Sequence, residues 1–526
     1  MIESRPVRLE DLLVGVGERK LVGRTDGDIT SLCYRSDQAE PGSLFFCAPG
    51  AKHDGHDFAH DAVQRGAVAL CVDRQLEEPV AQVVVPSVRR AMGPVAAEFF
   101  GHPSKQLVTV GITGTNGKTT SAFLVAHLLD KSGIRAGMLG TVEKRIGGVS
   151  SAAGRTTPEA LDLQRVLAEM VAAGDKAAVM EVSSHALDQG RTLGMRFGAL
   201  AFTNLTQDHL DYHESLDHYF AAKCLLFFDE AYQEGHPVAA INVDDPYGLQ
   251  IARRLPRNRV VALSSAVRPG PWGPADLEWS DYKVERGGTR GIMVVRGAAL
   301  EMMAAGRAGH SGLADAGGCA EVRLDVSTPL LGEFNVANML TALGTGLILG
   351  LDPRQMVDDV ADFGGVPGRM EPVDAGQEFV VIVDYAHTPD SVRNALETAR
   401  GFSKGRLISV VGCGGDRDKG KRPLMGREAE KASDLVIVTS DNPRSEDPLA
   451  IIGEITGGLT HPDRALVEPD RRRAIAQAIA GAREGDVVVI LGKGHETGQE
   501  FASETVPFDD RLVAKQALLA LREVAG

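Results

Sequence analysis

The glycine-rich segment 111–120, with the sequence GITGTNGKTT, constrains the fold more than any other part of the chain. The β-branched stretch QLVTV precedes it, and the following segment KTTSAFLVAHLLDKSG has the composition of a helix with Gly133 as its C-cap. A loop between a strand and a helix is typical of phosphate binding, because its glycines let backbone N–H groups converge on an anion. Lys118 adds a cation, and the Thr119 hydroxyl can bind Mg²⁺.

This segment departs from the strict phosphate-loop pattern, which would place its first glycine at Ile112. It fits G-x-x-G-x-x-G-K-T from Gly111 instead, and an ordinary strand-to-helix turn is the alternative. The density of glycines, the Lys-Thr pair and the strand–helix context together favour ATP binding. The residues expected to hold ATP are Gly114, Thr115, Asn116, Gly117, Lys118, Thr119 and Thr120.

The bulk properties of the chain exclude several classes of protein. Its net charge of −15 argues against nucleic-acid binding, which normally needs a basic face. The 6 cysteines are scattered without a Cys-x-x-Cys pair, which indicates a reducing compartment and no zinc site. No apolar run approaches the ~18 residues that span a bilayer, and the N-terminus lacks the apolar core of a signal peptide. We therefore expect a soluble cytoplasmic protein.

Strands alternate with helices along the chain, which predicts α/β architecture with parallel, doubly wound sheets. The expected buried strands are AAVMEVSS, ALAFTNL, PVAAINVDD, FVVIVDY, RLISVVG, DLVIVTS and DVVVILG. The helix NVANMLTALGTGLILG is expected to open the last α/β region, and the Gly/Ala-rich stretch 296–320 to be a surface insertion. Ligands of such sheets bind beyond the carboxyl ends of the strands, so the loops YAHTPD, CGGDRDKGKRP, DNPRSEDP and GKGHE are candidates for the site.

Two residues at expected strand ends could bind a metal near Thr119. Glu181 ends AAVMEVSS, and His209 lies in FTNLTQDHLDYH after the next strand. Each taken alone is compatible with a structural or solvated role. Mg²⁺ prefers oxygen ligands, so one carboxylate with phosphates suffices, whereas a His ligand suggests a second site that could also take Mn²⁺. Lys223, on an expected helix, by itself indicates only a surface lysine.

Motifs in a fixed order run through the central and C-terminal parts of the chain. They are GITGTNGKTT, MEVSSHALDQGR, FTNLTQDHLDYH, HYFAAK, INVDD, LLGEFNVANMLTA, PGRME, VDYAHTPDS, CGGDRDKGKRP, DNPR and GKGHE. This series resembles the Mur ligases of peptidoglycan synthesis. The resemblance covers nearly the whole chain, from YRSDQAEPGSLFF at 34–46 to GKGHE at 492–496, and only the stretch 296–320 has no counterpart.

The resemblance implies a three-domain architecture with a central P-loop-type parallel sheet and a C-terminal Rossmann-like domain. Residues 1–102 would bind uridine diphosphate, 103–330 would form the ATP-binding ligase domain, and 331–526 would bind the amino acid. The most similar members add meso-diaminopimelate to UDP-N-acetylmuramoyl-L-alanyl-D-glutamate, using ATP, Mg²⁺ and an acyl-phosphate intermediate. We expect a monomer whose partners are these two substrates, without nucleic acid or membrane insertion.

The resemblance also implies roles for single residues around ATP. Lys223 would carry a carbamate and bind metal together with Thr119, Glu181 and His209. Asp384 would bind the ribose, and Arg369 would neutralise the γ-phosphate. The full catalytic set would be Lys118, Lys223, Arg369 and His209, with Asn338, Asp384, Tyr385 and His387 as further ATP contacts.

The muramoyl dipeptide would be held by Ser36, Thr156, Thr157, Ser183, Gln189 and Arg191. By themselves these residues, with Pro158, indicate loop punctuation and a helix cap. Ser36 lies in Arg35-Ser36-Asp37, where the family usually has Asp-Ser-Arg, so the two charges are exchanged. The exchange puts the details of uridine diphosphate binding in question and leaves the expected substrate unchanged.

The DNPR motif at 441–444 follows an expected buried strand, and alone it indicates an Asx turn with proline. The resemblance makes it the amino-acid selector, since a planar Arg fork can bind the distal carboxylate that diaminopimelate has and lysine lacks. The expected contacts are Arg417, Asp441, Asn442, Arg444, Gly492 and Glu496. Some lysine-adding relatives vary at the arginine.

Other functions remain open at this point. A related ligase could add lysine or D-Ala-D-Ala, or could be of the folylpolyglutamate type. A protein of a different class, a non-catalytic nucleotide-dependent scaffold, would bind ATP without carboxylate-dependent turnover. The combination of Glu181, His209 and Lys223 argues for an enzyme.

Overall fold

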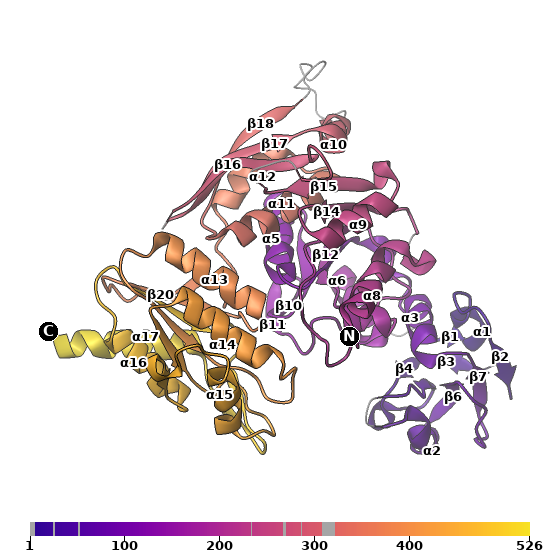
Figure 1. Cartoon of the computed structure of the whole chain (residues 1–526). Helices are drawn as coiled ribbons and strands as arrows, with labels where there is room; N and C mark the ends of the chain where they lie inside the picture. The colour runs from indigo at the N-terminus through magenta and orange to yellow at the C-terminus, as the bar shows by residue number, and fades with distance from the viewer. Residues whose placement is uncertain are drawn as a thin grey trace.

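Three α/β bodies follow one another along the chain (Figure 1). The structure, a computed structural model, describes residues 6–24, 27–50, 53–232, 234–266, 270–285, 287–307 and 321–525. The N-terminal and C-terminal bodies flank a larger central one, and the principal sheets have 5, 11 and 6 strands in chain order of the bodies. The expected three-domain α/β architecture is confirmed.

The N-terminal sheet has the order β2-β7-β6-β5-β4, with all neighbours parallel except the antiparallel edge strand β2. Its strands are β2 (Lys20–Val22), β4 (Ser31–Cys33), β5 (Ser43–Phe46), β6 (Ala67–Val72) and β7 (Ala81–Val84). The helix α3 (Val88–Phe99) follows and ends before His102, which has the left-handed φ of 54°. Pro103 then begins the short helix α4 (Pro103–Gln106).

The central sheet has the order β11-β10-β9-β12-β8-β13-β14-β15-β16-β17-β18 and is parallel from β9 to β16. The parallel strands are β8 (Val108–Thr113), β9 (Ala136–Leu139), β12 (Ala177–Glu181), β13 (Ala199–Phe202), β14 (Val238–Asn242), β15 (Val260–Ser264) and β16 (Leu277–Glu285). The antiparallel margins are β10 (Glu143–Ile146), β11 (Val149–Ala152), β17 (Gly288–Val295) and β18 (Val322–Thr328). β8 lies between β12 and β13, with Glu181 opposite Ile112 and Phe202 opposite Thr113.

Helices cover both faces of the central sheet, as a doubly wound fold requires. On one face α5 (Lys118–Lys131), α11 (Glu333–Ile348) and α12 (Pro353–Ala361) enclose an apolar core. On the other face α6 (Ala160–Ala172), α8 (Leu216–Phe228) and α9 (Pro246–Arg254) enclose a second core. The phosphate-binding candidate loop therefore emerges from a strand that is buried on both sides.

The helix α11 belongs to the central body, which differs from the expected boundary at residue 331. Met339 and Leu343 of α11 are fully buried in the same core as Leu124 and Leu128 of α5. The central core extends to Val366, and the C-terminal core begins at Met370. The apolar pattern of a helix identifies a buried element without identifying the sheet that covers it, which explains the difference.

The stretch 296–320, expected to be a surface insertion, begins with a helix. The helix α10 spans Gly297–Arg307, and its Ala299 is buried in the central core. The run GAALEMMAA is rich in residues of high helix propensity, which accounts for this helix. Residues 308–320 of the expected insertion lie outside the described residues.

The C-terminal sheet has the order β19-β20-β24-β21-β22-β23, parallel except for β19. Its strands are β19 (Glu371–Pro372), β20 (Val380–Asp384), β21 (Leu407–Val411), β22 (Leu435–Val438), β23 (Leu466–Val467) and β24 (Val487–Leu491). One face is covered by α13 (Pro389–Phe402), α14 (Lys421–Ala432) and α15 (Pro448–Thr456), and the other by α16 (Arg471–Ala480) and α17 (Asp510–Ala525). The four strands predicted here are confirmed. Within the described part of the chain, no helix has the length and apolar character needed to cross a membrane.

A buried ion pair is expected to contribute strongly to the stability of the C-terminal body. Arg471 Nη2 lies 2.6 Å from Asp510 Oδ2, both side chains are fully buried, and Arg471 also donates to the carbonyls of Ser440 and Leu491. Asp510→Ala leaves this guanidinium buried without its partner, so we expect a loss of about 3–5 kcal/mol in the free energy of unfolding, measured by urea denaturation.

The matched control for this pair is Arg473→Ala, which breaks the exposed pair with Asp470 at 3.8 Å. Its cost should stay below about 1 kcal/mol, because exposed pairs are screened by water. Equal losses for the two variants would contradict the importance assigned to the buried pair.

Candidate active site

The loop between β8 and α5 has the backbone that the glycine pattern predicts. Gly114 and Gly117 have φ values of 148° and 87°, in the region that favours glycine. A Cβ at Gly117 would overlap the Asn338 side chain, and one at Gly114 would overlap Thr203. Both positions therefore require glycine, and the loop leads directly into the N-terminus of a 14-residue helix, where backbone N–H groups favour an anion.

Lys118 folds back across this loop. Its Nζ donates to the carbonyl oxygens of Gly114 at 3.0 Å and Thr115 at 2.7 Å. Burial lowers the pKa of Lys118, while the nearby carboxylates of Glu181 and Asp208 oppose that shift. The Lys118 amine is thus held against the loop, where its positive charge would compensate the negative charge of a phosphate.

Glu181 lies beside the loop and is almost completely buried. Thr119 Oγ1 donates to its Oε2 at 3.0 Å, so the first turn of α5 and the end of β12 bring two of the expected metal residues together. Thr141 adds two further bonds, from its backbone N–H to Oε1 at 2.7 Å and from its hydroxyl to Oε2 at 3.1 Å. Sequence reasoning missed Thr141, which lies after β9 in the segment LGTVEK outside the motifs used.

Lys223 is not a surface lysine, which corrects the reading from its position alone. It is 1% exposed, and its Nζ donates to the Gly114 carbonyl at 2.7 Å and lies 4.5 Å from the centre of the Tyr219 ring. Burial lowers the pKa of this amine well below its ordinary value, and the neighbouring Lys118 lowers it further. The neutral amine, which is a nucleophile, is therefore favoured here.

His209 follows β13 at the same edge of the sheet, with a left-handed φ of 54°. Burial lowers its pKa to about 3, which keeps the imidazole neutral and able to bind a metal. Its neighbour Asp208 is buried too, but His209, His387 and Lys421 together hold the pKa of that carboxyl below its ordinary value. Asp208 and Lys421 are charged residues of the site that sequence reasoning did not select.

These side chains fit a magnesium site that is completed by a phosphate ligand. Among the described residues, no three His, Cys, Asp or Glu side chains converge as a closed metal cage. Mg²⁺ commonly takes one or two carboxylates together with phosphate oxygens and water. The Thr119 hydroxyl and the Glu181 carboxylate, bonded to each other at the phosphate loop, form such a partial ligand set.

A cavity of about 110 Å³ opens beside the loop, between the central and C-terminal bodies. Asn338 of α11 lines it and donates to Asn335 Oδ1 at 2.9 Å. Arg369 reaches across and donates to Thr119 Oγ1 at 3.3 Å. Asp384 lines the cavity with both carboxylate oxygens accepting backbone N–H groups, from Met370 at 2.7 Å and Ala386 at 2.8 Å. These three residues lie where the sequence placed ATP.

Tyr385 and His387, expected at ATP, line a different and larger cavity of about 460 Å³. The central body contributes residues that include Thr156, His209 and Asp208. All six residues expected to select the amino acid line the same cavity from the C-terminal side, namely Arg417, Asp441, Asn442, Arg444, Gly492 and Glu496. Successive side chains along an extended chain point in opposite directions. Asp384 and Tyr385, which are neighbours in sequence, can therefore line separate cavities.

A buried lysine organises the far end of this cavity. Lys493 Nζ donates to Asn442 Oδ1 at 2.7 Å and Glu496 Oε2 at 3.0 Å, and Asn442 Nδ2 donates to the same Glu496 oxygen at 2.7 Å. Burial raises the pKa of Glu496, and the neighbouring Asp441 raises it further. Lys493 was missed as a single residue, although the motif GKGHE contains it.

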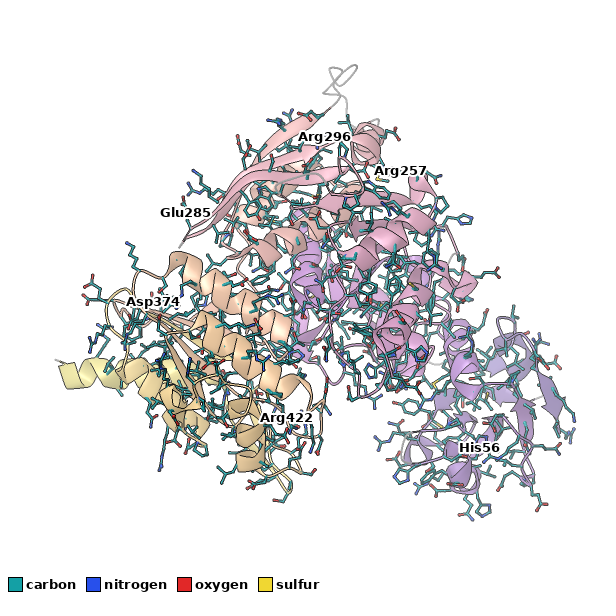
Figure 2. The ribbon with its side chains drawn as sticks, viewed as in Figure 1. His56, Arg257, Glu285, Arg296, Asp374 and Arg422 are labelled. Carbon is teal, nitrogen blue, oxygen red and sulfur yellow. The ribbon has the colours of Figure 1, made fainter. Side chains whose placement is uncertain are left out.

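The loop that carries Arg417 is tied down by a second buried cation. Arg422, labelled in Figure 2, lies in the C-terminal body and is fully buried. It donates to Glu446 and Glu454 at 2.8 Å and to the Gly414 carbonyl at 3.1 Å. Glu446 lies in the candidate loop DNPRSEDP without having been selected as a single residue, and Glu454 lies beyond that loop in α15.

The residues expected to hold the dipeptide form a bonded group next to Glu181. Thr157 Oγ1 donates to the Glu181 carbonyl at 2.8 Å, and Ser183 caps the helix α7 (Ser184–Asp188) by accepting from Ala186 N–H at 3.3 Å. Arg191 donates to Gln189 Oε1 at 2.7 Å and to the Thr157 carbonyl at 3.0 Å. Thr156 contacts the Thr141 hydroxyl at 3.0 Å.

Ser36 stands apart from that group. Its hydroxyl bonds the Asp61 carboxylate, and Arg35 and Asp37 pair with each other at 2.6 Å. A cavity of about 440 Å³ between the N-terminal and central bodies is lined instead by Tyr34, whose hydroxyl donates to Asp162 at 2.6 Å. Lys144, Arg155 and Arg165 also line this cavity. The exchanged charges of Arg35 and Asp37 thus neutralise one another locally.

Three family descriptions match the chain in succession. They are "Mur ligase family, catalytic domain" at residues 28–100, "Mur ligase middle domain" at 112–346 and "Mur ligase, glutamate ligase domain" at 368–494. The chain belongs to the Mur ligase family. The middle match ends inside α11 and the last begins after Val366, which agrees with the packing of that helix on the central sheet.

Relatives of nearly the same length share more than two fifths of their residues with this chain. A protein of Thermosynechococcus vestitus is 45% identical over 93% of both chains, and one of Gloeobacter violaceus is 43% identical over 97% of this chain and 98% of its own. Both are named UDP-N-acetylmuramoyl-L-alanyl-D-glutamate--2,6-diaminopimelate ligase. A solved structure with that name is 30% identical, with a TM-score of 0.66 over 98% of this chain and 100% of its own. Thermotoga maritima MurF ligase in complex with ADP shares the fold at 18% identity and a TM-score of 0.58.

The two glycines at the ends of α5 provide a test of the loop. Gly117→Ala forces an unfavourable backbone and a clash with Asn338, so we expect at least a tenfold loss of ATP affinity by calorimetry. Gly133→Ala is the control, because Gly133 has a φ of 77° and open space around it. It should cost about 1 kcal/mol of stability without changing ATP affinity. Equal nucleotide affinity in the two variants would contradict phosphate binding by this loop.

Proposed function

We propose that this chain adds meso-diaminopimelate to UDP-N-acetylmuramoyl-L-alanyl-D-glutamate in an ATP- and Mg²⁺-dependent reaction that passes through an acyl phosphate. One observation carries the proposal. Glu181 accepts from Thr119 beside the phosphate loop and is linked through Thr141 to Thr156, which lines the same cavity as the DNPR loop. Lys223 donates to a carbonyl of the phosphate loop itself. The name shared by relatives of 41–45% identity supports the same reaction.

In this proposal the loop 114–120 holds the triphosphate, with Asn338 and Asp384 near the nucleoside. Lys118 bonds the loop and Arg369 bonds Thr119 next to it, and both would offset the charge of the γ-phosphate. Thr119, Glu181 and Lys223 as its carbamate would hold Mg²⁺, with His209 at a second site, and the metal would supply further charge neutralisation. Thr141 fixes both oxygens of Glu181 for that purpose.

The reaction has two steps. A γ-carboxylate oxygen of the D-glutamyl residue attacks the γ-phosphorus, which breaks the bond to the bridging oxygen and releases ADP. The amine of diaminopimelate then attacks the acyl carbon, and the tetrahedral intermediate expels phosphate and yields the amide. The second step occurs between the two bodies, because the cavity of the amino acid is lined by His209 on one side and Asp441 on the other.

The amino-acid cavity suits a substrate that is charged at both ends. Arg444 and Arg417 present guanidinium groups for carboxylates, whereas Asp441 and Glu496 present acceptors for an ammonium. Asn442 and Gly492 complete this end. Lysine lacks the second carboxylate and would therefore form no bidentate bond with a guanidinium of this cavity, whereas a diacid would.

The other substrate is assigned to the groove between the N-terminal and central bodies. Thr156, Thr157, Ser183, Gln189 and Arg191 hold the dipeptide next to Glu181, and Ser36 lies toward the uridine end. The N-terminal body binds uridine diphosphate, the central body binds ATP, and the C-terminal body binds the amino acid. We further propose that the protein acts in the cytoplasm as a monomer.

Phosphate release with a panel of amino acids tests the function directly. We expect release only when ATP, Mg²⁺, the nucleotide-sugar dipeptide and diaminopimelate are all present. Turnover with lysine equal to that with diaminopimelate would reject the proposed specificity. ATP binding without any turnover, together with loss of partner binding in Lys118→Ala, would favour the nucleotide-dependent scaffold instead.

Lys223→Ala tests the carbamate. Without a bridging anion at this position, the rate of amide formation should fall by about 10²–10³-fold. Short-chain carboxylic acids should restore part of the activity, because they can occupy the space of the carbamate. Lys118→Ala serves as the control and should not be rescued, since it lacks a cation. Full activity of Lys223→Ala would contradict the assigned role.

A further inference from the structure

A short hairpin packs along the outer side of the DNPR loop. It consists of β25 (Gly498–Glu500) and β26 (Thr505–Pro507), which pair antiparallel. Gln499 Nε2 donates to the Asp441 carbonyl at 2.7 Å, and the Glu500 N–H donates to Asn442 Oδ1 at 3.0 Å. The Arg444 N–H donates to the Glu500 carbonyl at 3.0 Å. The hairpin therefore contacts Asp441, Asn442 and Arg444, the three polar residues of the DNPR loop.

The side chain of Glu500 also binds the guanidinium of Arg444. Arg444 Nε lies 2.6 Å from Glu500 Oε2, and Arg444 Nη1 donates to the Gly415 carbonyl at 2.9 Å. Arg444 has a left-handed φ of 51°, so its backbone is held in a conformation that few residues adopt without support. These two contacts thus anchor the guanidinium through Nε and Nη1, two of its three nitrogens.

Glu500 lies behind Arg444 with respect to the amino-acid cavity. Arg444 lines that cavity, whereas Glu500 does not. The Arg444 side chain is 22% exposed and that of Glu500 is 48% exposed, as expected for a carboxylate on the outer side. A substrate carboxylate in the cavity would thus meet the guanidinium on the face that Glu500 leaves open.

We propose that Glu500 is a positioning residue that fixes the Arg444 guanidinium for the second carboxylate of the amino acid and so sets the preference for a diacid. This inference rests on the proposed function. A free arginine side chain loses rotamer freedom when it binds a ligand, and a guanidinium that is already held in place loses less. Glu500 lies outside GKGHE, and no motif of the sequence points to it.

The opposite role for Glu500 is a competing internal carboxylate. In that role it would occupy Arg444 in place of the substrate, and its removal would tighten substrate binding. The two roles predict opposite changes in the KM for diaminopimelate when Glu500 is removed. The contacts favour positioning. Glu500 pairs with Nε of Arg444 from outside the cavity, and its backbone N–H and carbonyl bond Asn442 and Arg444 of the DNPR loop.

Steady-state kinetics with diaminopimelate test this role in Glu500→Ala and Glu500→Gln. We expect KM for diaminopimelate to rise about tenfold in Glu500→Ala, and less in Glu500→Gln, which keeps a neutral acceptor. KM for ATP and kcat should change less than twofold. Glu504→Ala is the matched control, because Glu504 lies on the same hairpin and, within the described part of the chain, its side chain has no hydrogen bond or ion pair, while its backbone carbonyl accepts from Phe501 N–H at 2.8 Å. It should leave KM unchanged.

A double-mutant cycle with Arg444→Ala separates positioning from a general effect on the hairpin. If Glu500 acts through Arg444, Glu500→Ala has no further effect on KM in the Arg444→Ala background. An equal effect in both backgrounds, a lower KM, or an unchanged KM in Glu500→Ala overturns the inference. The same assay distinguishes the two proposals, because a wild-type protein that does not turn over diaminopimelate refutes the proposed function regardless of Glu500.

Discussion

The active site depends on the parallel pairing of β12, β8 and β13. Their register puts Glu181 opposite Ile112 and Phe202 opposite Thr113, so the three strands end at one level. The phosphate loop, the carboxylate and the segment that carries His209 therefore leave the sheet at the same edge. A slip of one residue would turn each of these side chains to the other face. The strands have buried residues on both sides, which holds the register firmly.

Much of this arrangement could be predicted because it depends on local patterns. The buried strands, the glycines at 114 and 117, and the approach of Thr119 to Glu181 follow from strand-to-helix order and from the rule that ligands bind beyond strand ends. The six residues expected to contact the amino acid converge because they follow three neighbouring parallel strands, β24, β21 and β22, that end together. A family resemblance supplied the roles that spacing alone left open.

The rest depends on packing that sequence patterns do not encode. The burial of Lys223 and the position of Tyr385 are set by neighbours distant in sequence. Thr141, Asp208 and Lys493 are ordinary residues whose importance appears only in their bonds to other side chains. The helix α11 has the apolar pattern of any buried helix, and only the fold shows that it closes the central core. Such residues are fixed by contacts across the chain.

The segment that joins the central and C-terminal bodies has a consequence for timing. Arg369 belongs to this connection, between Val366 of one core and Met370 of the next, yet its guanidinium reaches Thr119 at the phosphate loop. A Cβ at Gly368 would overlap the backbone of the GKGHE loop, so the connection lies directly against the amino-acid side. One short stretch of chain thus touches both reactant sites. In the proposed reaction, a separation of the two bodies would therefore draw Arg369 away from the nucleotide and open the amino-acid cavity at the same time, so the open form would hydrolyse ATP slowly.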